Sequence, residues 1–113
     1  RLPMRLPRSD EAVVPLRKLT EYLLSESHPA GSSKAAFFRG VGFDEANVHL
    51  FESGLLAIAR NEDVVEVMPS PHGTKYVVDG EVATPAGGLA ALRTVWIVER
   101  EQDQPRFVTA YPK

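Results

Sequence analysis

Apolar residues change their spacing halfway along the chain. Over residues 15–60 they recur three and four positions apart, which places them on one face of a helix. Over residues 64–112 apolar and β-branched residues alternate with polar ones, as in strands. We expect about three helices, at residues 15–25, 34–39 and 44–60, and four strands, at residues 64–67, 76–83, 89–100 and 106–112. Helices that precede strands predict an α+β fold, with the helices packed on one face of a four-stranded antiparallel sheet.

Three residues refine the helical half. Pro15 suits the first turn of a helix, because its missing N–H has no intrahelical partner there. Asp44 is a suitable N-cap for the third helix. Gly54 falls inside that helix, where glycine costs roughly 1 kcal/mol relative to alanine. We therefore expect Gly54 to permit close packing.

Proline and glycine bear on the extent of the first two predicted strands. Pro69 and Pro71 are expected to end the first strand, because proline cannot donate to a sheet ladder. Residues 76–83 leave two alternatives, a strand with a bulge at Gly80 or a hairpin about Asp79 and Gly80.

The start of the chain differs from the remainder. Residues 1–11 contain two Leu-Pro pairs and three arginines. Proline at this density disfavours a helix, so we expect an extended arm or a linker remnant, followed by a single domain over residues 12–113. Because the chain starts at Arg1 and not at Met, we expect a processed product or a domain cut from a longer polypeptide.

Composition excludes several classes of site. The chain has no cysteine, which rules out disulfides, thiolate zinc sites and a cysteine nucleophile. Its three histidines show no metal-ligand spacing, so we expect neither a metal nor a cofactor. No apolar run approaches 18 residues, and we expect no membrane anchor.

Charge is distributed unevenly along the chain. The net charge is −2, but residues 1–39 carry seven Lys/Arg and four Asp/Glu, or +3. Residues 40–92 carry two and eight, or −6, and residues 93–113 carry four and three, or +1. If the fold brings the two ends together, they form a modest positive patch. The alternative is a mixed, solvated surface.

The last predicted strand offers polar groups for a site. If it is extended, Phe107, Thr109 and Tyr111 point to one side. A hydroxyl and a phenol on one face can line a shallow cleft on a sheet. The alternative is a core or edge strand whose Thr and Tyr simply fit a pleated surface.

Arg93 interrupts an otherwise apolar strand, so it either binds an anionic ligand or pairs with Glu81 or Glu99 on a neighbouring strand. If the last hairpin pairs Arg100 with Arg106, then Arg93 shares a face with Thr109 and Tyr111. A slip of one residue would separate them.

His28 is a candidate for proton transfer, because an imidazole titrates near neutral pH. It stands in a loop ahead of the second helix. Lys34 lies in the first turn of that helix, where its charge and the backbone N–H groups can hold a phosphate. The alternative is a histidine that only tethers the loop.

Several short motifs carry a resemblance that covers nearly the whole chain from about Leu6. They are His28-Pro29-x-Gly31-x-x-Lys34-Ala35-x-Phe37-Phe38, Gly73-x-x-Tyr76-Val77-Val78-x-Gly80, Arg93-Thr94-Val95-Trp96-Ile97-Val98 and Pro105-Arg106-x-Val108-Thr109-x-Tyr111-Pro112. Together they resemble a bacterial family described only as a domain of unknown function. Its members are often small proteins with a small neighbour, or C-terminal domains of large secreted polypeptides. This arrangement suggests a toxin with an antitoxin or immunity protein.

The order of elements and the tail also resemble ribonuclease toxins of the barnase–EndoU–colicin–RelE superfamily. That resemblance implies metal-independent transesterification of RNA, possibly tRNA, in the cytoplasm of a target cell. It implies His28 as base or acid, Lys34 and Arg93 as phosphate ligands, and Thr109 and Tyr111 as groups that orient phosphate oxygens or donate a proton. The negative net charge departs from many such toxins. The alternative function is a non-catalytic protein-binding module of a two-gene or polymorphic-toxin system.

Overall fold

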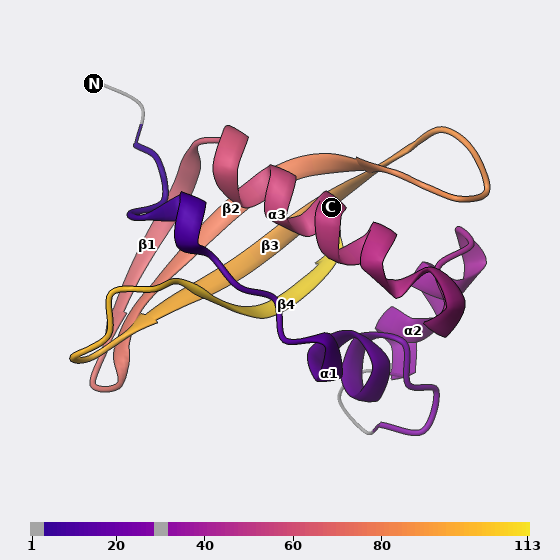
Figure 1. Ribbon diagram of the computed structural model, residues 1–113, viewed down its shortest axis with the longest axis horizontal. Coiled ribbons are helices and arrows are strands. Elements are labelled where there is room, and N and C mark those ends of the chain that lie inside the picture. The colour runs from indigo at the N-terminus through magenta and orange to yellow at the C-terminus, as the bar shows by residue number, and fades with distance from the viewer. Residues whose placement is uncertain (1–3, 29–31) are drawn as a thin grey trace.

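The fold is three helical regions followed by a four-stranded sheet, as the change of spacing predicts (Figure 1). The computed structural model describes residues 4–28 and 32–113. The helical elements are η1 (Ser9–Glu11), α1 (Leu16–Lys18), η2 (Leu19–Leu23), α2 (Ser32–Gly40), η3 (Glu45–Asn47) and α3 (Val48–Asn61). The strands are β1 (Val64–Ser70), β2 (Gly73–Ala83), β3 (Leu89–Glu99) and β4 (Arg106–Pro112). They form an antiparallel sheet in the order β1-β2-β3-β4, which confirms the α+β prediction.

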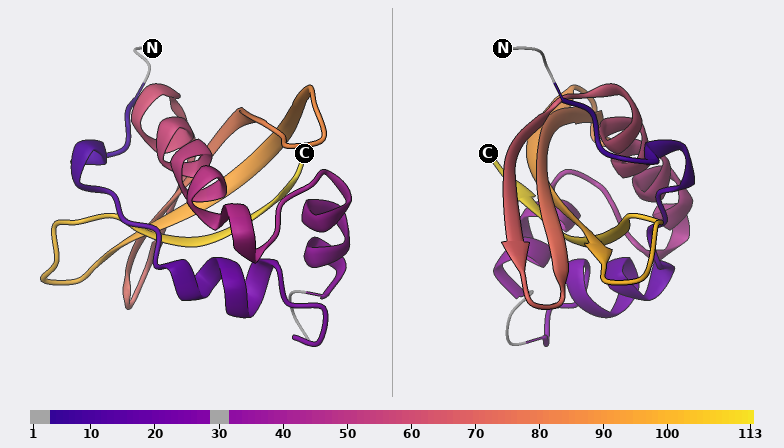
Figure 2. Two further views of the ribbon diagram at one scale, coloured as in Figure 1. Left: turned by 45° about the vertical axis from the view of Figure 1, so that its right-hand side comes forward. Right: turned by 90° about the vertical axis from the view of Figure 1, so that its left-hand side faces the viewer.

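Helix α3 lies across the sheet, and two glycines let it approach β2 closely (Figure 2). A Cβ on Gly54 of α3 would stand 3.0 Å from Cγ1 of Val82 in β2. A Cβ on Gly80 of β2 would stand 2.8 Å from Cγ1 of Ile58 in α3. Gly54 therefore permits close packing, as expected. The apolar face of α3 is buried through Val48, Phe51, Leu55 and Ile58.

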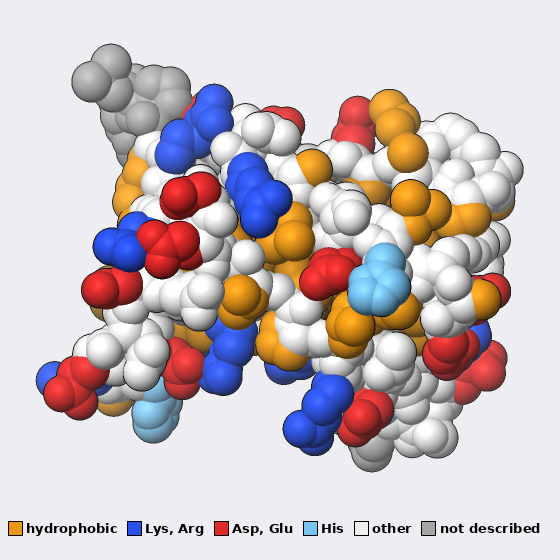
Figure 3. All heavy atoms as spheres, viewed as in Figure 1, with side chains coloured by type: hydrophobic (Ala, Val, Ile, Leu, Met, Phe, Trp, Pro, Cys, Tyr) orange, Lys and Arg blue, Asp and Glu red, His pale blue; other side chains and the backbone are white. Residues whose placement is uncertain are grey.

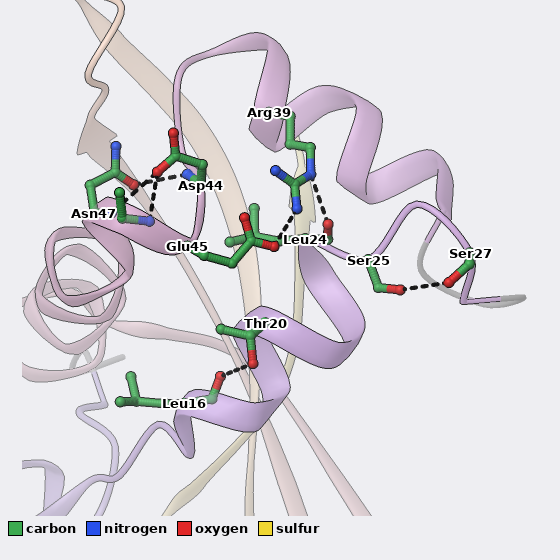
Figure 4. A network of polar contacts seen from close by, with 10 residues as sticks. Leu16, Thr20, Leu24, Ser25, Ser27, Arg39, Asp44, Glu45 and Asn47 are labelled. Atoms are coloured by element: carbon green, nitrogen blue, oxygen red, sulfur yellow. Dashed lines mark hydrogen bonds and ion pairs between the residues drawn. The ribbon is translucent and has the colours of Figure 1, made fainter.

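Polar contacts fix the helices relative to one another (Figure 4). Asp44 Oδ1 accepts hydrogen bonds from the backbone N–H groups of Ala46 and Asn47, and the Asn47 side chain accepts one from the Asp44 N–H. Asp44 thus caps the turn that leads into α3, as predicted. Arg39 of α2 donates to the carbonyl of Leu24 at 2.8 Å and pairs with Glu45. This arginine ties the end of the first helical region to α2 and to the start of η3.

The segment ahead of α1 packs on the domain. Leu6 is buried in the core, and Arg5 pairs with Asp63 at 2.9 Å. Val13 lies beside the start of β4, where its N–H donates to the carbonyl of Pro105 and its carbonyl accepts from the N–H of Phe107, both at 3.0 Å. Both α1 and α2 contact β4, so the N-terminal helices lie next to the last strand (Figure 2).

Strand β1 extends further than predicted. It runs through Pro69, which pairs with Thr74, and ends at Ser70. The prediction that Pro69 ends the strand is wrong, because β1 is an edge strand and a missing N–H can face outward there. Strand β2 continues without a break through Gly80, which pairs with Leu92. Neither the bulge at Gly80 nor the hairpin alternative occurs.

A bulge in β4 changes which residues share a face. Val95 pairs with Thr109 but Trp96 pairs with Phe107, so Val108 is the extra residue. Phe107 is therefore buried against Trp96, with ring centroids 5.4 Å apart. The prediction that Phe107 points to the same side as Thr109 is wrong for this reason.

The predicted pairing of Arg100 with Arg106 is also wrong, because Arg106 lies opposite Ile97. Arg93 instead pairs directly with Tyr111, two positions from the pair of Val95 and Thr109. Because side chains alternate along a strand, Arg93, Thr109 and Tyr111 still share the sheet face away from the core.

Arg93 forms a two-point ion pair with Asp79, which lies opposite it on β2. Its Nε and Nη2 donate to the two carboxylate oxygens at 2.8 and 2.9 Å, and Lys113 Nζ lies 3.1 Å from the same carboxylate. The partner is neither Glu81 nor Glu99, because the strand register brings Asp79 across from the guanidinium. The hydrogen bonds from Arg93 lower the pKa of Asp79 more than partial burial raises it, and Lys113 lowers it further.

The glycine contact between α3 and β2 predicts a packing defect. Gly80→Ala places a methyl group against Ile58 and should lower the free energy of unfolding by about 1–3 kcal/mol in denaturant melts. Gly40→Ala is the control, because a Cβ there meets nothing within 4 Å. Replacing Ile58 by alanine removes both γ carbons that meet the new methyl group, so Gly80→Ala should cost less in the Ile58→Ala background than in the wild type. Equal free energies of unfolding for Gly80→Ala and Gly40→Ala would contradict the close approach of α3 to β2.

The Asp79 pair predicts a pH-dependent contribution to stability. The pKa of Asp79 in the folded state lies below the ordinary value of 3.8, so its stabilisation is present above that value. It is lost as the pH falls through the lower folded-state pKa. Asp79→Asn should therefore lower the unfolding free energy by about 1–2 kcal/mol at neutral pH, and the gap should close in acid. The exposed Asp103→Asn is the control, and a gap that stays constant with pH would contradict the assignment.

Candidate active site

Three distant segments meet around the side chain of Tyr22. Tyr22 belongs to η2, and its hydroxyl lies 3.0 Å from Thr109 Oγ1 on β4, 87 residues further along the chain. The ring of His28, just after η2, lies edge-on to the Tyr22 ring with centroids 5.1 Å apart. Tyr22 thus links the imidazole of His28, from the first part of the chain, to the last strand, β4.

Two lysines flank the same ring. Lys18 Nζ lies 5.3 Å and Lys34 Nζ 5.5 Å from the centroid of Tyr22. At these distances the negative face of an aromatic ring attracts an ammonium group. The lysines come from α1 and from the first turn of α2, so both helical segments deliver a cation to one position.

The surroundings of Tyr22 alter its acidity. Burial of the ring raises the pKa of Tyr22, but this effect is outweighed. Hydrogen bonds of the phenol with Thr109 and Lys34 lower it, and so do the positive charges of Lys34 and Lys18. The net result is a phenol whose pKa is lowered from its ordinary value. Such a group loses its proton more readily than an ordinary tyrosine.

An open pocket of about 590 Å³ lies next to Tyr22. Its lining residues come from the first helical region, the following loop and the start of β4, and they are Pro15, Arg17, Lys18, Glu21, Tyr22, His28 and Arg106. Three cations and one carboxylate give this set a formal charge of +2, against −2 for the chain. The two basic ends of the sequence therefore meet at the pocket.

Carboxylates offset the pocket charge only in part. Arg17 lies 3.6 Å from Glu21 on the same helix turn, and both side chains are largely exposed, so this pair contributes little. Arg106 pairs with Glu99 at 2.7 Å. On the face that carries α3, acidic and basic side chains are mixed with apolar ones (Figure 3). At the pocket, positive charge and concave shape coincide.

The predicted site residues fall into two groups. His28, Lys34 and Thr109 gather around Tyr22. Arg93 and Tyr111 form a cross-strand pair further along the outer face of the sheet, where Asp79 engages two donors of Arg93. Thr109 connects the groups, because it is two residues from Tyr111 on the same face of β4.

The loop before α2 is described in part. The carbonyl of His28 accepts a hydrogen bond from the N–H of Ser32 at 3.0 Å, which closes the loop. Pro29 and Gly31 of the His-Pro-x-Gly motif lie outside the described residues.

Sequence reasoning missed Tyr22, Lys18 and Arg106. Lys18 and Tyr22 are four positions apart, which indicates one face of a helix, and this spacing was the available signal. Nothing local showed that this face meets β4. Arg106 could not be assigned either, because its position depends on the register of the last hairpin.

Within residues 4–28 and 32–113, no three His, Asp or Glu side chains gather as a metal site. Across the same residues, no helix is both long and apolar enough to span a bilayer.

Comparison with known proteins identifies both a structural relative and a family. A chain of the contact-dependent growth inhibition toxin–immunity protein complex from Klebsiella pneumoniae 342 superposes with a TM-score of 0.71. The match covers 93% of this chain and 96% of that chain at 17% sequence identity, so it shows a shared fold. Among curated proteins, none matches the sequence. The family model described as "Domain of unknown function (DUF6883)" matches residues 5–113, and the chain therefore belongs to this family.

Proposed function

We propose that this domain is a toxin-type endoribonuclease that cleaves RNA, including tRNA, by metal-independent transesterification, and that a cognate antitoxin or immunity protein neutralises it. The observation that carries the proposal is the cationic pocket at which His28 and the Tyr22–Thr109 contact meet. An imidazole, a phenol, a hydroxyl and several cations are the groups that this reaction requires.

The proposed reaction needs no external cofactor. The ribose 2′-OH attacks the adjacent phosphorus, a 2′,3′-cyclic phosphate forms, and the P–O5′ bond breaks. His28 takes the proton from the 2′-OH. Lys18, Lys34 and Arg106 stabilise the extra negative charge that develops on the phosphorane oxygens.

The surface beyond the pocket extends the proposed binding site along the RNA. Tyr111 lies two positions beyond Thr109 on β4, which corresponds to roughly 7 Å. A nucleotide next to the scissile one therefore reaches Tyr111 and Arg93. Asp79 already engages Arg93 Nε and Nη2, so this arginine contributes charge and position with its remaining donors.

The comparisons support the biological part of the proposal. The solved relative is a chain of a toxin–immunity protein complex, which fits a toxin or immunity module with a protein partner. A toxin of this kind is delivered as the C-terminal domain of a secreted protein and acts in the cytoplasm of the target cell, where tRNA is present.

One observation favours the alternative, a non-catalytic protein-binding module. The edge strand β1 exposes Val65 by 53% and Val67 by 41%. An exposed, apolar edge strand is suited to pairing with a strand of another chain. The two functions differ in one respect: a ribonuclease needs the pocket residues to cleave RNA, and a protein-binding module does not.

The ribonuclease proposal predicts cleavage without metal. The purified domain, incubated in EDTA with total RNA and with tRNA, should give fragments that end in a 2′,3′-cyclic phosphate. His28→Ala should lower the rate by about 10²–10⁴-fold, because it removes the base. His72→Ala is the matched control, since His72 lies in the turn between β1 and β2, outside the pocket lining.

Expression in a bacterium that lacks the partner gives a second readout. The wild type and His72→Ala should stop growth, and His28→Ala should not. Intact RNA with the wild type, or undiminished cleavage by His28→Ala, would remove the ribonuclease proposal and leave the protein-binding module.

A further inference from the structure

Transesterification needs an acid as well as a base, and in the proposed reaction His28 acts as the base. The oxygen of the leaving group must gain a proton as the P–O5′ bond breaks. We propose that Tyr22 is the general acid that donates this proton to the 5′ oxygen. This assignment rests on the proposed ribonuclease function and adds a catalytic residue to it.

The position of Tyr22 suits this role. Tyr22 and His28 both line the pocket, with their ring centroids 5.1 Å apart. A phosphodiester seated there can lie within hydrogen-bond reach of both groups. The phenol oxygen is held on the side of Thr109, and the imidazole meets the ring from another direction. This arrangement lets one group face the attacking oxygen and the other face the leaving oxygen.

The groups around the phenol stabilise its deprotonated form. Thr109 can donate to the phenol oxygen, and Lys18 and Lys34 bring two positive charges to it. The carboxylate nearest in sequence, Glu21, also lines the pocket but lies beside Arg17. The lowered pKa of Tyr22 agrees with this arrangement. A phenol whose anion is stabilised is a better acid in the transition state.

The backbone at Tyr22 is an independent observation. Residues Leu19–Leu23 form a π-helical turn, in which the N–H of Leu24 donates to the carbonyl of Leu19 at 2.7 Å. Such turns are rare in proteins as a whole, and those that do occur are often found at functional sites. Leu19, Leu23 and Leu24 are fully buried and anchor the turn. The widened turn thus holds Tyr22 towards β4 and the pocket.

Protons and electrons balance in the proposed transesterification step. His28 accepts the 2′-OH proton, the 2′ oxygen bonds to phosphorus, and the electron pair of the P–O5′ bond moves to the 5′ oxygen. That oxygen takes the proton of Tyr22. The products are a cyclic phosphate, a free 5′-OH, an imidazolium and a phenolate, and a proton transfer between the last two through water restores the site.

A purely structural role for Tyr22 makes a different prediction. If the phenol only tethers η2 to β4, its partner Thr109 shares that role equally. Tyr22→Phe and Thr109→Val would then impair the protein to the same extent, whatever the leaving group. If Tyr22 is the acid, the two variants separate, and the effect of Tyr22→Phe depends on the leaving group.

The test uses the full chain and an RNA oligonucleotide that spans the main site cleaved in tRNA. A second oligonucleotide carries sulfur in place of the 5′ oxygen, because a thiolate leaves without being protonated. Tyr22→Phe should cut the normal oligonucleotide about 10²–10⁴-fold more slowly than the wild type. It should cut the sulfur oligonucleotide within about tenfold of the wild type, for the same reason. Thr109→Val should lose less on the normal oligonucleotide.

The pH profile gives a second readout. The alkaline fall in kcat/KM of the wild type reports the acid that must stay protonated, and 3,5-difluorotyrosine at position 22 should move that fall to lower pH. This substitution keeps the phenol, so it serves even if Tyr22→Phe fails to fold. An unmoved alkaline fall, or equal losses on both oligonucleotides, would overturn the role of Tyr22. A wild type that cleaves no RNA would overturn the proposed function itself.

Discussion

The hydrogen bond between Tyr22 and Thr109 is the contact on which the rest of the site depends. It joins the first helical region to the last strand, so that residues from both ends of the chain share one position. The buried leucines of η2 hold the helical side, and the pairing of β4 with β3 and Val13 holds the strand side. Because both sides are fixed by the core, His28, Lys18 and Lys34 converge on the Tyr22 ring from different segments of the chain.

Charge and shape then reinforce each other. The chain carries a net charge of −2, yet its pocket lining carries a formal charge of +2. Negative charge on the remainder of the chain disfavours nonspecific binding to nucleic acid, and a local positive region in a concave site favours an anionic ligand. The Arg93–Asp79 pair belongs to a different part of the sheet, where it ties β2 to β3 and to Lys113. One face of β4 thus carries Thr109 beside Tyr22 and, two positions further on, Tyr111 opposite Arg93.

Much of the fold could be predicted from the spacing of residues, because local periodicity reports which faces are buried. The helices, the Asp44 cap and the close packing at Gly54 follow from such local rules. The failures all depend on contacts between distant segments. Pro69 is tolerated because β1 is an edge strand, and the bulge at Val108 separates Phe107 from Thr109. His28, Lys34 and Thr109 could be named as candidates, but Tyr22 could not. Its spacing from Lys18 indicates one face of a helix, yet nothing local shows the π-helical turn or the contact of that face with β4.

The most direct test of the central claim is to locate bound RNA on the protein. The ¹⁵N-labelled domain would be titrated by NMR with an oligonucleotide that carries 2′-deoxyribose at the cleaved position, so that it binds without reacting. The account predicts the largest chemical-shift changes at Lys18, Tyr22, His28 and Arg106. It also predicts that these changes become smaller as the salt concentration is raised, because salt weakens phosphate contacts. Shifts confined to β1 or to the surface of α3, with none around Tyr22, would contradict it.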